Sequence, residues 1–285
     1  MRILMGDIQN MKEQKLKRNF IGKIIKGIMG IVIFMVIGIM IINSLDNNEI
    51  IHEANVEILS NHDYDWSKLI DNNGRKSYVD NEGNEALSGI DVSTYQGDIE
   101  WDKVKSDNID FAIIRAGYRG YESGEINEDD KFKKNISGAI NNGIDVGVYF
   151  FSQAISEEEA KEEAEFILDA IKGYEVKYPI VFDMEYVENG RINSLSMEER
   201  TNITLAFCEV IKNAGYEPMI YGNQFWLQEY VSLHDINDYE LWLAQYNERP
   251  NFPYEFRVWQ YTDSGQVDGI EGNVDLNLWF KSVEK

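Results

Sequence analysis

The sequence predicts an α/β protein whose eight strands close into a barrel. Short apolar runs alternate along the chain with segments of helical periodicity, and this alternation is typical of a parallel sheet covered by helices. Eight such runs fall within the last ~200 residues, a number that suits a closed barrel. The last few strands are expected to follow one another through short links. A long apolar segment near the N-terminus predicts a membrane-spanning helix ahead of this domain.

The strands are expected where β-branched and aromatic residues cluster between Gly, Asn and Asp. They are Ile90–Ser93, Phe111–Ala116, Asp145–Phe151, Ile180–Met184, Met219–Tyr221, Leu241–Gln245, Phe256–Tyr261 and Val274–Leu276.

The predicted helices have recognisable ends. They are Trp101–Ser106, Asp130–Asn142, Ser156–Lys172, Ser196–Ala214 and the weaker Asn223–Tyr230. Ser156 with Glu159, and Ser196 with Glu199, each predict a capping box at a helix N-terminus. Glycines follow three of these helices, where a left-handed residue commonly ends a helix: Gly143, Gly173 and Gly215.

The N-terminal region differs from the rest in charge and hydropathy. Residues 1–45 hold seven Lys and Arg against two acids, so they carry a charge of +5. Because the formal net charge of the chain is −23, the remainder carries −28. Residues 24–42 give the ~20 apolar positions that a bilayer span needs. The basic residues of 1–23 predict a cytoplasmic tail, which places the C-terminal body outside. A cleaved signal peptide is the alternative, but the apolar run is longer than the ~7–15 residues typical of such peptides, and no A-x-A-like site follows it.

Residues 43–85 are predicted to be a polar linker, with a possible small hairpin over 77–87, and residues 86–285 form the main domain. The strongly acidic body excludes nucleic acid as a partner, because phosphates would be repelled. Cys208 lies in an apolar-periodic stretch and is expected in the core. Three histidines in all, His52, His62 and His234, nearly exclude a His-rich metal site.

The most informative short segment is Val181-Phe182-Asp183-Met184-Glu185. Side chains two residues apart on a strand project to the same face, so Asp183 and Glu185 are expected side by side. Close carboxylates push their pKa values apart, which acid catalysis uses; the alternative is an acidic strand end that faces water.

Other acids and many aromatic residues fall at comparable positions. Asp91 lies on the first predicted strand and Asp275 on the last, and chemistry in such barrels lies at the C-terminal strand ends. Acids and aromatic faces without metal ligands are typical of a carbohydrate cleft, although barrel packing explains each aromatic residue taken alone. The aromatic residues are Tyr118, Tyr149, Tyr221, Trp242, Tyr246, Trp259 and Tyr261.

These segments resemble glycoside hydrolase family 25 lysozymes, the N-acetylmuramidases. The opening Gly89-Ile90-Asp91-Val92-Ser93-Thr94-Tyr95-Gln96-Gly97 carries the resemblance, as does the Asp-x-Glu of Asp183 and Glu185. It continues in order to about Phe280, through 111–116, 147–151, 241–246, 259–261 and 274–277. The resemblance implies a modified β/α barrel with an incomplete outer helix ring and no metal cofactor. It also implies hydrolysis of the β-1,4 bond from N-acetylmuramic acid to N-acetylglucosamine in peptidoglycan.

The resemblance also implies residue roles. Glu185 is expected to be the general acid, and Asp183 its partner that orients the substrate N-acetyl group or stabilises positive charge. Asp91 and Asp275 match the two further acids of the site. Substrate contacts are expected from Tyr149, Tyr118, Tyr95, Trp242, Tyr246, Trp259 and Gln260. The last four are the weaker candidates, for either a substrate contact or a scaffold role.

Several alternatives stay open. The carboxyl spacing of an Asp-x-Glu pair lies between the retaining and inverting ranges, and the substrate's own acetamide is a third possible nucleophile. The expected protein is a wall hydrolase in the bacterial cell membrane, with a cytoplasmic N-terminus and an extracellular catalytic domain. Its partners are peptidoglycan strands, the membrane and, as an open question, an envelope-spanning machine. A wall-binding module without catalysis and an enzyme for chitin-like polymers are the competing hypotheses.

Overall fold

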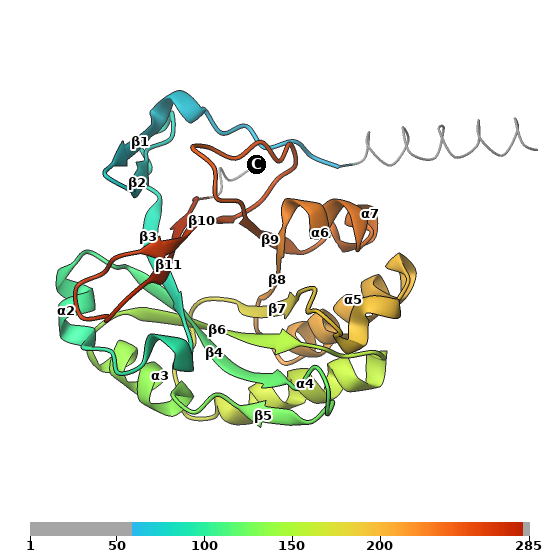
Figure 1. The fold of residues 1–285 in the computed structure, drawn as a ribbon. Helices are drawn as coiled ribbons and strands as arrows, with labels where there is room; N and C mark the ends of the chain where they lie inside the picture. Colours follow the sequence, from blue (N-terminus) through green and yellow to red (C-terminus); the bar gives the residue numbers. More distant parts are fainter. Residues whose placement is uncertain (1–58, 282–285) are drawn as a thin grey trace, which may run out of the picture. The chain divides into compact units, whose positions relative to one another are not determined.

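The computed structural model describes residues 59–281, and Figure 1 shows their arrangement. Eight strands form the barrel: β3 (Leu87–Val92), β4 (Phe111–Arg119), β6 (Asp145–Ser152), β7 (Ile180–Met184), β8 (Pro218–Asn223), β9 (Glu240–Ala244), β10 (Val258–Gly265) and β11 (Val274–Trp279). The helices are α2 (Trp101–Ser106), α3 (Phe132–Asn141), α4 (Glu157–Ala170), α5 (Met197–Asn213), α6 (Gln224–Glu229) and α7 (Leu233–Ile236). Short 3-10 turns are η1 (Trp66–Lys68), η2 (Thr94–Gln96) and η3 (Arg191–Ser194).

The sheet closes into a barrel. Its strand order is β3-β11-β10-β9-β8-β7-β6-β4, and β4 pairs back onto β3 in parallel register. A ninth strand, β5 (Ile126–Glu128), pairs with the far end of β4 outside the closed circle. All eight predicted strands are confirmed. The sheet is not the purely parallel one that the strand–helix alternation predicts, because the last strand, β11, runs antiparallel to both β10 and β3.

The helix ring is incomplete, as expected from the resemblance. Helices follow β3, β4, β6, β7 and β8, while the described chain contains none between β9 and β10 or between β10 and β11. The capping box predicted at α5 is present, with Ser196 and Glu199 bonded reciprocally. The one predicted at α4 is only half formed: Ser156 accepts the Glu159 amide, but the Glu159 side chain accepts from the Ile155 amide and pairs with Arg191 instead.

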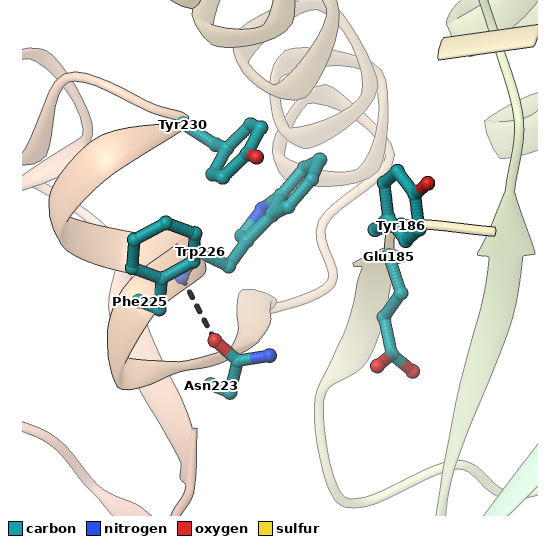
Figure 2. Close-up of a pocket in the computed structure, with 6 residues that line it drawn as sticks. All are labelled: Glu185, Tyr186, Asn223, Phe225, Trp226 and Tyr230. Atoms are coloured by element: carbon teal, nitrogen blue, oxygen red, sulfur yellow. Dashed lines mark hydrogen bonds between the residues drawn. The ribbon is translucent and has the colours of Figure 1, made fainter. Parts of the chain in front are cut away.

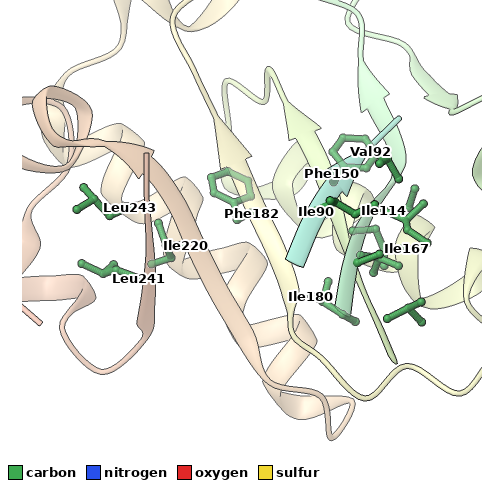
Figure 3. Packing of buried hydrophobic residues seen from close by; sticks show 14 of the residues in the cluster. Ile90, Val92, Ile114, Phe150, Ile167, Ile180, Phe182, Ile220, Leu241 and Leu243 are labelled. Carbon is green, nitrogen blue, oxygen red and sulfur yellow. The ribbon is translucent and has the colours of Figure 1, made fainter. Parts of the chain in front are cut away.

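Two apolar cores lie on opposite faces of the barrel wall, because neighbouring strand residues point to opposite sides. The outer core packs Ile114, Phe150, Phe182 and Ile220 against the helices (Figure 3). The inner core fills the barrel with the alternate residues, including Ile113, Val181, Met219, Trp242 and Val258. Cys208 is buried in the outer core, as predicted. The packed interior leaves the rim of the barrel as the place for polar groups.

Residues 59–85, predicted as part of a polar linker, instead form structure that belongs to the compact unit beginning at Leu59. Strands β1 (Leu69–Asn72) and β2 (Arg75–Tyr78) pair around Asn73 and Gly74, both at positive φ. Of the hairpin predicted over 77–87, a single bridge joins Val79 to Glu85.

Aromatic residues hold this N-terminal segment to the barrel. The Tyr64 ring lies 4.4 Å from that of Phe280, and its hydroxyl donates to the Phe256 carbonyl at 2.6 Å. Trp66 packs against Trp259 and stacks parallel to Phe256. The transmembrane helix predicted over 24–42 lies outside the described residues. Between residues 59 and 281, none of the helices is long and apolar enough to cross a bilayer.

Candidate active site

Four acids meet at one rim of the barrel. Asp183 is the inward-facing residue near the end of β7, and Glu185 follows directly after the strand. Asp91 lies near the end of β3, and its register partner on β11 is Asp275. Because β11 is antiparallel, its first residues reach the rim at which the parallel strands end. The four predicted catalytic acids are therefore brought together, and each one perturbs the ionisation of at least one other.

Asp91 is the most completely hydrogen-bonded of the four. Its Oδ2 accepts from Gln260 Nε2 at 2.9 Å and from Asn277 Nδ2 at 2.8 Å. The Gln260 amide is oriented in turn by two hydroxyls, since its Oε1 accepts from Tyr221 at 2.9 Å and from Tyr246 at 2.8 Å. An amide oxygen that accepts two hydroxyl protons leaves the amide nitrogen to face the carboxylate.

Burial and mutual repulsion raise the pKa of every acid in the group. Burial is the largest cause for Asp91, whose pKa rises to about 6 despite its two amide donors. The pKa of Asp275 rises to about 8, through burial and then through repulsion by Asp91 and Asp263. Like charges that cannot all be solvated favour retained protons. The rim is thus set up to hold protons near neutral pH.

The Asp183–Glu185 pair shows the same effect most strongly. Burial and then the Glu185 and Asp91 charges raise the pKa of Asp183 well above its usual range, and its Oδ1 has no hydrogen-bond partner among the described residues. The pKa of Glu185 is also raised by burial, less far because the Asp183 side chain hydrogen-bonds to it. Two such carboxyls titrate as a pair, and their raised pKa values favour the retention of a proton for acid chemistry.

A buried arginine, Arg115, interacts electrostatically with Asp183. Arg115 of β4 forms an ion pair with the buried Asp129, with Nε and Nη2 both 2.8 Å from Oδ2. The Arg115 guanidinium lies 5.0 Å from the ring centroid of Tyr95 and 5.4 Å from that of Tyr118. Tyr149 interacts electrostatically with Arg115 and with three of the acids, and burial raises its pKa well above the usual range. The predicted Tyr149, Tyr118 and Tyr95 therefore border the site.

The remaining predicted contacts divide between cleft and scaffold. Tyr246 is 51% exposed and Tyr95 is 83% exposed, so both offer ring surface to a ligand. Trp242 is buried inside the barrel, and its Nε1 donates to Asn277 Oδ1 at 2.8 Å. It therefore helps to orient the Asn277 amide that donates to Asp91. The prediction that Trp259 binds substrate is not borne out: its ring is 0% exposed in the outer core, and its Nε1 donates to the Gln245 carbonyl. Alternation along β10 explains this, because Gln260 faces inward.

The sequence reasoning missed a set of contacts behind Glu185. Gln153, at the end of β6, donates from Nε2 to the Glu185 carbonyl at 3.0 Å. Arg191 of η3 donates to the Gln153 carbonyl and forms a two-point ion pair with Glu159 of α4, at 2.8 and 3.0 Å. Partly buried, bidentate pairs of this kind fix geometry as well as charge. No short motif marks them, since the four residues are spread over 38 positions.

A second missed feature is an aromatic pocket beside Glu185, with a volume of about 280 Å³. It is lined by Glu185, Tyr186, Asn223, Phe225, Trp226 and Tyr230, and Figure 2 shows the rings of α6 facing Tyr186 and Glu185 across a gap. Its residues come from the ends of adjacent strands β7 and β8 and from α6. Asn223 lies at the end of β8, and this strand-end position is the sequence feature that could have indicated the pocket.

The described part of the chain holds no cluster of three or more His, Cys, Asp or Glu side chains arranged to bind a metal ion. The arrangement provides carboxyls with raised pKa values, a buried guanidinium and exposed aromatic faces. These groups can donate a proton to a buried oxygen and stabilise a positive charge that develops next to it.

Comparison with known proteins gives a consistent result. The model of the glycosyl hydrolases family 25 matches residues 90–270. YegX of Escherichia coli strain K12 is 32% identical over 207 residues, which cover 70% of this chain and 71% of YegX. The autolytic lysozyme of Clostridium acetobutylicum is 27% identical over 69% of this chain and 57% of its own length.

Among solved structures, the modular autolysin LytC of Streptococcus pneumoniae, in complex with a synthetic peptidoglycan ligand, superposes with a TM-score of 0.62. It is 29% identical and covers 74% of this chain. The chain spans about half of the autolysin, 52% of its length.

Proposed function

The chain belongs to glycosyl hydrolases family 25, and from this premise we propose that it is a lysozyme that cleaves the β-1,4 bond between N-acetylmuramic acid and N-acetylglucosamine in peptidoglycan. Membership makes it a glycoside hydrolase. The relatives that carry an activity in their names are lysozymes, and the autolysin structure holds a peptidoglycan ligand. The observation that carries the proposal for this chain is the group of four carboxyls with raised pKa values at one barrel rim.

In the proposed reaction, Glu185 donates its proton to the glycosidic oxygen as the bond from that oxygen to the anomeric carbon breaks. The raised pKa of Glu185 lets it keep this proton to a higher pH than a solvated glutamate would. Positive charge then develops on the sugar ring, and the neighbouring carboxyls stabilise it. Water adds to the anomeric carbon, and the proton that it loses returns to the enzyme.

Asp183 is the partner in this scheme. Its carboxyl is buried beside Glu185 and can accept a hydrogen bond from the acetamide N–H, which turns the acetamide oxygen toward the anomeric carbon and leaves that oxygen free to attack. We therefore favour participation of the substrate acetamide as the internal nucleophile, with Asp183 as the residue that orients it. Attack by a carboxylate or by an activated water are the two other routes, and the stereochemistry of the product separates them.

We also propose that the enzyme acts from the membrane. Residues 24–42 supply an apolar span, and the basic residues before it favour a cytoplasmic N-terminus. The catalytic domain would then face the cell wall. Cell fractionation followed by protease treatment of intact cells tests this: the account expects a membrane-bound chain whose C-terminal domain is digested from outside.

The test of the catalytic assignment is Glu185→Gln, which removes the proton but keeps the shape. A general acid typically contributes 10²–10⁴-fold, so kcat for release of reducing ends from peptidoglycan should fall by about that factor. Binding to sedimented peptidoglycan should persist. Unchanged activity would overturn the role of Glu185. Sedimentation of the wild-type chain with peptidoglycan, with no release of reducing ends, would instead favour a binding module.

A further inference from the structure

The N-terminal segment, residues 59–85, covers a part of the barrel wall that lacks helices. The described chain has no helix between β9 and β10 or between β10 and β11, yet Trp259 and Tyr261 in the outer core are 0% and 3% exposed. The ring of Trp66 lies 6.1 Å from that of Trp259, and the Lys76 amide donates to the Tyr261 hydroxyl at 3.4 Å. The segment therefore takes the place that a helix has elsewhere on the barrel.

Lys76 of β2 is the charged residue of this contact. Its side chain is only 8% exposed, and its ammonium lies 5.7 Å from the ring centroid of Trp259 and 6.0 Å from that of Tyr261. Its Nζ donates to Asp71 of β1 at 2.8 Å and to the backbone carbonyl of Glu248 at 3.1 Å. A lysine usually keeps its ammonium in water while its stem lies on apolar surface. Here the ammonium is directed at a backbone carbonyl instead.

That carbonyl belongs to a loop of the candidate active site. Residues 245–251 follow β9, and we call them the cleft loop because they carry Tyr246. Trp259 Nε1 donates to the Gln245 carbonyl at 2.7 Å, and the buried lysine donates to the Glu248 carbonyl. The backbone is thus held on both sides of Tyr246, once from the barrel wall and once from the N-terminal segment.

Tyr246 links the cleft loop to the acids. Its hydroxyl donates to Gln260 Oε1 at 2.8 Å, and Gln260 Nε2 donates to Asp91 Oδ2 at 2.9 Å. Its ring is 51% exposed at the rim. A displacement of the cleft loop would therefore move an exposed ring of the cleft and release one of the two hydroxyls that orient the Gln260 amide.

We propose that Lys76 is a positioning residue, through which the N-terminal segment holds the cleft loop and so sets the place of Tyr246. A segment that only covered the wall would need no charge here, because burying an ammonium is costly and an apolar side chain of similar size packs as well. The family model matches residues 90–270, so this support comes from outside the matched residues. The proposal rests on the lysozyme function proposed above.

The test compares two substitutions on β2 in the full-length chain. Lys76→Met keeps an apolar stem against the two rings and removes the donor to the loop. Arg75→Met is the control, because Arg75 pairs with Asp107 and donates to the Gln266 carbonyl, neither of which lies in the cleft loop. Urea midpoints establish that both variants fold. Hydrogen exchange of the backbone amides in 245–251 is followed by mass spectrometry, and kcat/KM is measured for release of reducing ends from peptidoglycan.

A double-mutant cycle identifies the residue through which Lys76 acts. Lys76→Met is measured in the wild-type chain and again in Tyr246→Phe, which lacks the hydroxyl that reaches Gln260. Substitutions that act through one contact are not additive, whereas a general loss of stability would add to the effect of Tyr246→Phe.

We expect about tenfold faster exchange in the cleft loop of Lys76→Met and unchanged exchange in Arg75→Met. We also expect kcat/KM to fall by about five- to tenfold in Lys76→Met, but by less than about twofold when Tyr246→Phe is already present.

Unchanged exchange in Lys76→Met would show that the lysine does not hold the loop. Faster exchange with unchanged kcat/KM, or an equal loss of kcat/KM with and without the Tyr246 hydroxyl, would overturn the positioning role. If the wild-type chain releases no reducing ends, the lysozyme function fails, and the exchange measurement alone then decides whether Lys76 holds the cleft loop.

Discussion

Asp91 and Asp275 are register partners on the antiparallel strands β3 and β11, so two carboxyls face the barrel mouth from directly opposed positions. Like charges directly opposite on a sheet are destabilising. The pair persists because both groups have raised pKa values, about 6 for Asp91 and about 8 for Asp275, so that they are not both ionised near neutral pH. The sheet thus places two carboxyls that resist ionising together at the rim where acid chemistry is proposed.

The first prediction concerns stability and pH. Because the pKa of Asp275 is raised from 3.8 to about 8, the folded chain binds its proton across a range in which the unfolded chain has released it. The free energy of unfolding should therefore fall as pH rises from about 4 to 8. Asp275→Asn removes this proton and should flatten the slope. Urea midpoints measured from pH 4.5 to 8.5 test it, and an unchanged slope in the variant would contradict it.

The second prediction concerns the alkaline limb of the activity profile. The Asp275 charge raises the pKa of Glu185, in addition to burial. Asp275 carries that charge only above about pH 8, where it is ionised. Asp275→Asn removes the charge, so in this alkaline range Glu185 should lose its proton at lower pH. We expect a lower maximal kcat/KM and an alkaline limb displaced to lower pH, measured on soluble glycan strands. A limb that stays in place or moves to higher pH would show that Asp275 does not control the acid.

The third prediction concerns the contacts behind Glu185. Arg191→Lys keeps the charge but loses the two-point pair with Glu159, which loosens the Gln153 carbonyl and with it the Glu185 backbone. Small displacements of a catalytic group are costly, so kcat should fall by about tenfold while KM changes little. Lys161→Ala, which breaks an exposed pair with Glu157 on α4, is the control and should be neutral. Equal kcat in both variants would leave Arg191 without a positioning role.

The fourth prediction concerns the segment over 59–85. Tyr64→Phe removes the hydrogen bond to the Phe256 carbonyl and should lower the free energy of unfolding by about 0.5–1.5 kcal/mol. Tyr64→Ala also removes the ring contacts with Phe256 and Phe280 and should cost about 3–5 kcal/mol. Urea denaturation of the full-length chain measures both. Stability of Tyr64→Ala within about 0.5 kcal/mol of wild type would place the segment outside the cooperative unit.

Most of the fold could be predicted because its signals are local. Each strand is a short apolar run, and Ser196 with Glu199 marks a helix start through contacts between residues three apart. The direction of β11 could not be predicted, because alternation with period two is the same in parallel and antiparallel strands. Polar composition likewise concealed the structure over 59–85, where a few aromatic residues such as Tyr64 and Trp66 hold the segment to the barrel.

The acids of the site could be predicted from their strand-end positions, whereas their supports could not. Gln153 and Arg191 act through backbone carbonyls, which leave no trace in a sequence pattern. The substrate role of Trp259 is wrong, whereas its alternative role as scaffold agrees with its burial in the outer core. Alternation along the strand predicts this, since an inward Gln260 places its neighbour outward. Tyr186 follows β7 and Phe225 lies on α6, which follows β8, so the two meet only because β7 and β8 are adjacent.

The central claim is that this rim cleaves the glycan strand after N-acetylmuramic acid. Mass spectrometry of borohydride-reduced fragments, after digestion of peptidoglycan by the full-length chain, tests this claim most directly. Glu185→Gln serves as the blank. The account predicts fragments that end in reduced N-acetylmuramic acid and that are absent from the blank. Fragments that end in reduced N-acetylglucosamine would contradict it.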